Sequence, residues 1–268
     1  MTSPVVSRIE VEPGVFLSVA TRGDPAGPAL VFSNSLAADR RMWDGVVAAL
    51  GERGRLVTYD TRGHGNSDVP AGPYSLSRLG EDVVAILDAL GIARACFCGL
   101  SLGGLTGMWL AAHRPDRVSG LILANTAPAF PPASMWCERA QVARSEGVGP
   151  LAAGTLERWL TAGFRAENPD QVETVRDMIA ATPPEGYAAC CAVLGEADMT
   201  VALASIRCPV LVVTGRHDAS TPPATGRSVL DGIGHGDLIE LATAHLSAIE
   251  QPPEFAEAAG RFLDRLGC

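Results

Sequence analysis

Short apolar runs that alternate with longer helical patterns constrain this chain more than any other feature. Two runs at 7–11 and 15–21 predict an opening hairpin, and further β-rich runs occur at 29–33, 56–59, 95–99, 118–124, 209–214 and 237–241. Residues 79–90 form a helical pattern that ends at Gly91, with one apolar stripe made of Val83, Val84, Ile86, Leu87 and Leu90. This alternation predicts an α/β fold with a mostly parallel sheet.

The middle of the chain departs from this pattern. From about Pro128 to Ser205, a proline-rich start is followed by helical segments at 136–146, 151–161, 170–181 and 187–194, with no strand-like run. We therefore predict an all-helical cap of residues 131–205, inserted between strands of a core formed by residues 1–130 and 206–268. Such a cap would cover the strand ends, where α/β folds bind ligands.

Composition excludes several classes of protein. The formal net charge is −9 and no basic run occurs, which argues against nucleic acid and anionic membranes as partners. All 21 basic residues are Arg. Schiff-base, pyridoxal-phosphate, P-loop and protein-kinase chemistries each need a Lys amine, so they are excluded.

Cysteine usage and apolar patterning bear on the compartment. The seven Cys are odd in number and form no C-x-x-C pair, so neither a disulfide framework nor a zinc site is expected. We expect all of them to be buried small hydrophobes in a reducing compartment: Cys96, Cys98, Cys137, Cys190, Cys191, Cys208 and Cys268. Charged residues in 8–12 interrupt any signal-peptide core, and no stretch reaches the length of a membrane span. The expected location is the cytosol, and the sequence does not indicate an oligomeric state.

A candidate nucleophile lies in Gly99-Leu100-Ser101-Leu102-Gly103, which matches the G-x-S-x-G nucleophile elbow. The pattern alone is weak, but it follows a predicted strand and opens a predicted helix at 102–113. Leu105, Met108, Trp109 and Ala112 would supply the buried stripe of that helix. Flanking glycines permit the sharp turn that exposes Ser101. The alternative is a glycine-rich turn with an incidental Ser.

A serine hydroxyl needs a base and an orienting acid. His245 follows the last predicted strand at the edge that carries Ser101, and is better placed than His64, His113, His217 or His235. Asp218 follows the strand at 209–214 and completes the chain order Ser, Asp, His. Asn125 occupies the other strand tip where an acid could lie, and Asp60 fits a structural turn residue better.

The oxyanion of an acyl-transfer intermediate needs two donors. One is the backbone N–H of Leu102, and we assign the other to Leu36, in the loop that follows residues 29–33. Alternatively, that loop only packs against its neighbours.

The chain resembles the α/β-hydrolase-fold proteins, and among them the 3-oxoadipate enol-lactone hydrolases. Core motifs carry part of the likeness: Ser33-Asn34-Ser35-Leu36, Arg41-Met42-Trp43-Asp44, Tyr59-Asp60-Thr61-Arg62-Gly63-His64-Gly65, the elbow, and Asn125-Thr126-Ala127. Cap segments and the last loop carry the rest: Trp136 with Glu138-Arg139, Glu157-Arg158-Trp159, Gly186-Tyr187-Ala188, and Ala242 to Ser247.

This resemblance implies Ser101 as nucleophile, His245 as base, Asp218 as acid, and Leu36 and Leu102 as backbone donors. It implies a reaction without cofactor or metal, in which Ser101 opens the lactone to an acyl-enzyme and water releases 3-oxoadipate. The small-molecule substrate carries a carboxylate, for which we predict Arg139 as partner, because a guanidinium binds carboxylate bidentately. Arg139 could instead face solvent, and Trp136 could be a pocket wall or part of the cap core.

Two other functions are compatible with these residues. A general carboxylesterase or a C–C bond hydrolase would use the same triad with a different pocket. A ligand receptor would keep the fold and triad without turnover. A haloalkane dehalogenase is disfavoured because its elbow carries Asp where this chain has Ser101.

Overall fold

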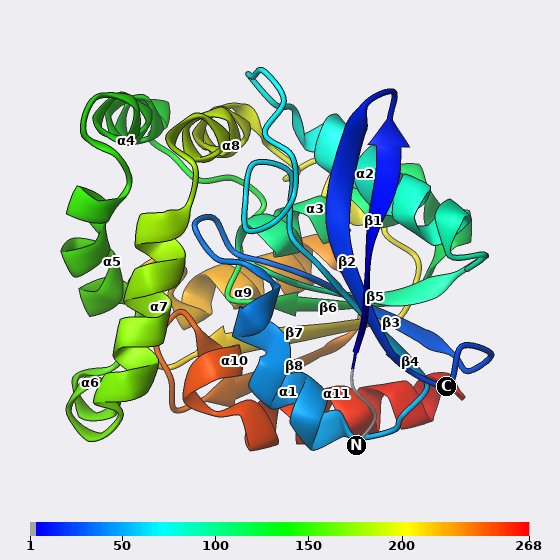
Figure 1. The fold of residues 1–268 in the computed structure, drawn as a ribbon. Helices are drawn as coiled ribbons and strands as arrows, with labels where there is room; N and C mark the ends of the chain where they lie inside the picture. The colour runs from blue at the N-terminus through cyan, green and yellow to red at the C-terminus, as the bar shows by residue number, and fades with distance from the viewer. Residues whose placement is uncertain (1–3, 268) are drawn as a thin grey trace.

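An eight-stranded sheet forms the centre of the computed structural model, which describes residues 4–267 (Figure 1). The strand order is β1-β2-β4-β3-β5-β6-β7-β8. The first two strands pair antiparallel, β2 pairs antiparallel with β4, and the others run parallel. The strands are β1 Val5–Glu12, β2 Val15–Gly23, β3 Ala29–Ser33, β4 Arg55–Tyr59, β5 Ala95–Leu100, β6 Val118–Ala124, β7 Val210–Gly215 and β8 Asp237–Leu241.

The predicted mostly parallel α/β sheet is confirmed. Strands β3, β6 and β8 have the predicted bounds, and the other strands differ from prediction by one or two residues at one or both ends. Strands β3, β5 and β7 are buried along their whole length, which is why they appear in the sequence as continuous apolar runs.

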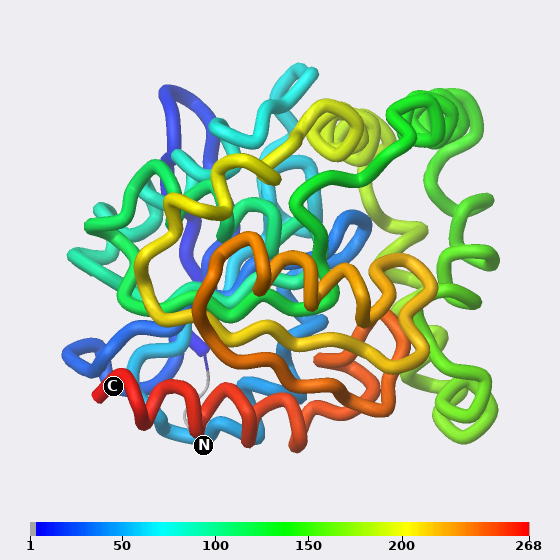
Figure 2. Tube along the Cα trace, turned by 180° about the vertical axis from the view of Figure 1, so that it is seen from behind, coloured from blue at the N-terminus to red at the C-terminus, as the bar shows by residue number. Residues whose placement is uncertain are grey.

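Helices cover both faces of the sheet. Helices α2 Leu76–Ala89, α3 Leu102–His113 and α9 Pro223–Ile233 contact one side, and α1 Asp44–Leu50 packs with α11 Pro252–Leu266 on the other. Figure 2 shows α11 running along the edge of the core beside α1. The sequence analysis did not identify α1, α9 or α11.

The buried side of α2 differs from the predicted stripe. Val84 and Leu90 are only half-buried, whereas Asp82 is buried. Its carboxylate accepts hydrogen bonds from Nε (2.5 Å) and Nη2 (2.6 Å) of Arg62. The spacing of apolar residues could not indicate that Asp82 is buried, because a charged side chain is buried only where an opposite charge pairs with it. Helix α3 also differs, since it is buried on nearly all sides.

Between β6 and β7 the chain forms helices that lie together at one side of the core (Figure 1). They are α4 Ala133–Glu146, α5 Ala152–Trp159, α6 Ala162–Glu167, α7 Pro169–Ala181 and α8 Pro184–Glu196. Helix α4 packs against α8 and α5 against α7. In the described part of the chain between β6 and β7, the only β-type pairing is an isolated antiparallel bridge between Ala129 and Asp198.

The prediction that every cysteine is buried was wrong. Cys137 is exposed because it lies on the outer side of α4, and Cys208, just before β7, is half-buried. Cys268 lies outside the described residues. Within residues 4–267, no helix combines the length and apolar character needed to cross a membrane.

Candidate active site

Strand register brings distant loops to one edge of the sheet. Ser33 pairs with Gly99, and Leu100 pairs with Ala124. On the far side of β7, Gly215 pairs with Leu241. Because parallel strands end at the same edge, the residues that follow β3, β5, β6, β7 and β8 all gather there.

Ser101 occupies a strained turn between β5 and α3. Its backbone angles, φ 57° and ψ −113°, lie in a region where residues other than glycine are seldom found. Its N–H donates to the carbonyl of Ala124 (3.0 Å), and its carbonyl accepts from the hydroxyl of Thr126 (2.7 Å). The neighbouring strand tip therefore holds the turn in place.

Two glycines make this turn possible. A Cβ at Gly99 would lie 2.1 Å from the carbonyl oxygen of Gly103, and one at Gly103 would lie 2.2 Å from that of Ser33. Both distances are far below van der Waals contact. The G-x-S-x-G pattern is therefore required here for close backbone packing.

Asp218 and His245 meet at the tips of β7 and β8. Nδ1 of His245 donates to Oδ2 of Asp218 (2.9 Å), and both side chains are buried. Because Nδ1 donates, Nε2 is left to accept a proton. Burial favours a raised pKa for Asp218, but attraction to His245 and hydrogen bonds from His245 and Thr221 lower that pKa to about 2. The carboxylate is thus ionised at neutral pH.

Asn125 holds Asp218 and the loop around His245, a role that the sequence did not predict. Its Nδ2 donates to Oδ2 of Asp218 (3.0 Å) and to the carbonyl of Ala244 (3.1 Å). Its Oδ1 accepts from the hydroxyl of Ser247 (2.6 Å). The amide therefore fixes both the acid and the loop around His245. Its position directly after a predicted strand was a signal, but the partners are distant in sequence.

The two residues predicted to donate to the oxyanion are buried near the turn at Ser101. Leu36 is 4% exposed and Leu102, the first residue of α3, is 1% exposed. The loop that carries Leu36 is held on both sides. Asn34 accepts from Trp43 Nε1 (3.1 Å) and donates to the carbonyl of Tyr59 (2.9 Å), while Ala37 N–H donates to Nε2 of His64 (3.0 Å).

A cavity of about 770 Å³ opens beside these groups, and core and cap residues both line it. Ser101, His245 and Leu36 contribute from the core, and Trp136 and Arg139 from α4. Trp136 is half-buried and donates from Nε1 to the carbonyl of Phe130 (2.6 Å). The structure therefore places both predicted binding residues on the wall of the cavity.

Arg139 and Arg158 give the cavity wall positive charge. Arg139 donates from Nε to Tyr187 Oη (2.8 Å) and from Nη2 to Thr155 Oγ1 (3.3 Å). Desolvation and the nearby charge of Arg139 lower the pKa of Arg158, a pocket residue that sequence reasoning did not single out. Glu138 also lines this cavity, so two guanidiniums stand against one carboxylate on its wall. The excess of positive charge favours an anionic ligand.

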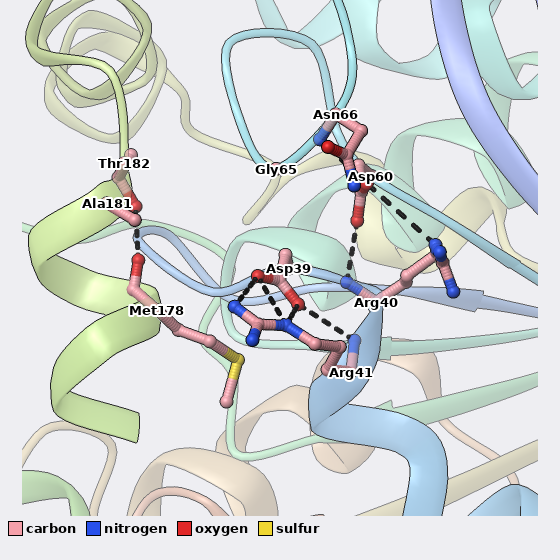
Figure 3. A pocket seen from close by; sticks show the side chains of 9 residues that line it. All are labelled: Asp39, Arg40, Arg41, Asp60, Gly65, Asn66, Met178, Ala181 and Thr182. Atoms are coloured by element: carbon pink, nitrogen blue, oxygen red, sulfur yellow. Dashed lines mark hydrogen bonds and ion pairs between the residues drawn. The ribbon is translucent and has the colours of Figure 1, made fainter. Parts of the chain in front are cut away.

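A second cavity, of about 360 Å³, lies between the loops after β3 and β4 and the end of α7 (Figure 3). Its two carboxylates already have hydrogen-bond partners. Asp60 accepts from the N–H of Arg40 (2.8 Å) and of Asn66 (3.0 Å), and Asp39 pairs with the guanidinium of Arg41 (2.6 Å). Asp60 thus acts as the structural turn residue that was predicted. In the described part of the chain, no group of three His, Cys, Asp or Glu side chains is arranged to hold a metal ion.

Comparison with known proteins identifies the family of this chain. A family model described as alpha/beta hydrolase fold matches residues 28–146. The chain is 43% identical to 3-oxoadipate enol-lactonase 2 of Acinetobacter baylyi over 94% of both chains, and 40% identical to 3-oxoadipate enol-lactonase 1 of that organism over 93% of this chain and 94% of the other. The crystal structure of the enol-lactonase from Burkholderia xenovorans superposes with a TM-score of 0.93 at 40% identity, covering 96% of this chain and 99% of the other. The chain belongs to the 3-oxoadipate enol-lactonase family of α/β hydrolases.

Proposed function

We propose that this protein hydrolyses 3-oxoadipate enol-lactone to 3-oxoadipate in the cytoplasm, with Ser101, His245 and Asp218 as its catalytic triad. In this proposal, the core formed by residues 1–130 and 206–268 carries the triad. The cap, residues 131–205, binds the substrate carboxylate. The exposed thiol of Cys137 suits a reducing compartment.

The reaction proceeds in two acyl-transfer steps. His245 Nε2 accepts the proton of Ser101 Oγ as that oxygen attacks the lactone carbonyl, and the N–H groups of Leu36 and Leu102 stabilise the oxyanion. As the ring C–O bond breaks, protonated His245 gives its proton to the departing oxygen, which leaves as an enol and tautomerises to the ketone. Water activated by His245 then attacks the acyl-enzyme and releases 3-oxoadipate.

One observation supports the choice of substrate: the cavity beside Ser101 is lined by two guanidiniums, Arg139 and Arg158, and by one carboxylate, Glu138. A neutral ester leaves the excess positive charge of this wall uncompensated. The enol-lactone brings a carboxylate beyond its ring, and a guanidinium binds that group bidentately.

Arg139→Ala tests this assignment. We expect KM for the enol-lactone to rise about tenfold to a hundredfold, because a charge-assisted hydrogen bond is lost, whereas KM for a neutral p-nitrophenyl ester changes far less. Arg144→Ala is the matched control, since Arg144 lies on the same helix and pairs with Glu185. An equal rise of KM for both substrates would refute the role of Arg139.

A further inference from the structure

The loop that carries His245 is linked to the cap directly on one side of the histidine and through Glu250 on the other. On one side, Leu246 N–H donates to the carbonyl of Trp159 at the end of α5 (3.0 Å). On the other side, Ala244 N–H donates to Oε1 of Glu250 (2.6 Å). The indole ring of Trp159 also lies 6.0 Å from the imidazole of His245, centroid to centroid.

Glu250 connects these two parts of the molecule through its two carboxylate oxygens. Oε1 accepts from the histidine loop, and Oε2 accepts from both the N–H (3.1 Å) and the hydroxyl (2.6 Å) of Thr161. Thr161 is the N-cap of α6, and its hydroxyl oxygen accepts from Phe164 N–H (3.2 Å). One half-buried carboxylate therefore joins the start of a cap helix to the residue before His245.

The charge on Glu250 suits this arrangement. A carboxylate has acceptor sites on both oxygens and no proton, so it satisfies donors from two directions at once. Hydrogen bonds to an ionised acceptor are also shorter and stronger than neutral ones. Glutamine has one acceptor oxygen only. Its NH2 group would therefore face either the N–H of Ala244 or the donors of Thr161, and neither could accept a hydrogen bond from it in the same geometry.

We propose that Glu250 is a positioning residue, which holds His245 in register with the cap and so couples placement of the cap to proton transfer. This inference rests on the proposed serine-hydrolase function of the same site. Glu250 contacts neither substrate nor the reacting atoms in this account. Its effect should appear in the rate of the chemical steps.

Glu250→Gln tests the proposal with the full-length protein. We expect kcat to fall about tenfold to a hundredfold on the enol-lactone and on a neutral p-nitrophenyl ester alike, because small displacements of a catalytic base cost this much, while KM changes less than kcat. Labelling of Ser101 by a fluorophosphonate should slow in parallel. Glu254→Gln, at an exposed position of α11, is the charge-matched control and should keep wild-type kcat.

The cap half of the link is tested at Thr161. Thr161→Val removes the hydroxyl and should lower kcat, Thr161→Ser keeps it and should restore kcat, and Thr161→Val should add little to Glu250→Gln. A Glu250→Gln protein with normal kcat per titrated active site and only a lower unfolding midpoint would overturn the proposal. So would a Thr161→Val protein with wild-type kcat. If Glu250→Gln does not fold, the two Thr161 variants decide.

The ester and phosphonate readouts do not depend on the lactone. A wild-type protein that is active on the ester but inactive on the enol-lactone would contradict the proposed substrate and leave the test of Glu250 intact.

Discussion

His64 has no part in the proposed chemistry, yet it holds the loop that would contact the oxyanion. Its Nε2 accepts from Ala37 N–H (3.0 Å), one residue after Leu36, and its Nδ1 lies 3.2 Å from the carbonyl of Arg62. The ring is fully buried, and burial lowers the pKa of His64 to about 4, outweighing its hydrogen bond to Arg62. Protonation would place an N–H against the N–H of Ala37 and disturb this loop.

This burial predicts an acid-dependent loss of stability. The pKa of His64 is about 6.5 when the chain is unfolded and about 4 when it is folded. The unfolded state therefore binds more protons between these values. The free energy of unfolding should be highest above pH 6.5 and fall by about 3 kcal/mol as the pH approaches 4.

His64→Gln checks this prediction by urea unfolding at pH 7, 5.5 and 4. Between pH 7 and pH 4, the free energy of unfolding of the variant should fall much less than that of the wild-type protein. His235→Gln, at an exposed position, should show the wild-type fall. An unchanged pH slope in His64→Gln would show that other groups cause the acid sensitivity.

At the scale of elements, the buried strands were predictable and several helices were not. Strands β3 and β6 were found with correct bounds because both of their faces are covered and nearly every residue is apolar. Helix α9 begins directly after Pro222, and its apolar face is short, so its start resembled a loop. Helix α11, by contrast, has clear apolar spacing through Phe255 and Phe262, and that signal was overlooked.

The junction of β5 and α3 supplies a prediction at this scale. Gly103→Ala would place a Cβ 2.2 Å from the carbonyl oxygen of Ser33, the last residue of β3. Helix α3 would therefore have to move away from β3. We expect the free energy of unfolding to fall by about 1–3 kcal/mol or more, with loss of activity because Ser101 moves. Chemical denaturation and ester turnover measure both effects.

Gly163→Ala is the control for this change. Gly163 lies on the exposed side of α6 with nothing within 4 Å of a Cβ, so alanine should stabilise that helix by about 0.5–1 kcal/mol. A Gly103→Ala protein that is as stable and as active as wild-type would contradict the close packing at the turn.

For the whole molecule, the sequence indicated which strand tips carry the candidate triad but not what supports it. Ser101, Asp218 and His245 could be singled out as candidates because each follows a recognisable strand in a known order. Asn125 supports Asp218 from 93 residues away, and Glu250 reaches Thr161 across 89. The first contact joins two strand tips of the core and the second joins core to cap, so both form only in the folded chain and no local spacing reports them.

Turnover of synthetic 3-oxoadipate enol-lactone by wild-type protein and by Ser101→Ala tests the central claim most directly. We expect wild-type protein to hydrolyse the lactone to 3-oxoadipate and kcat to fall about a thousandfold or more in the variant, because the proposed nucleophile is removed. Wild-type protein that does not open the lactone, or a Ser101→Ala protein that retains most of the activity, would contradict that claim.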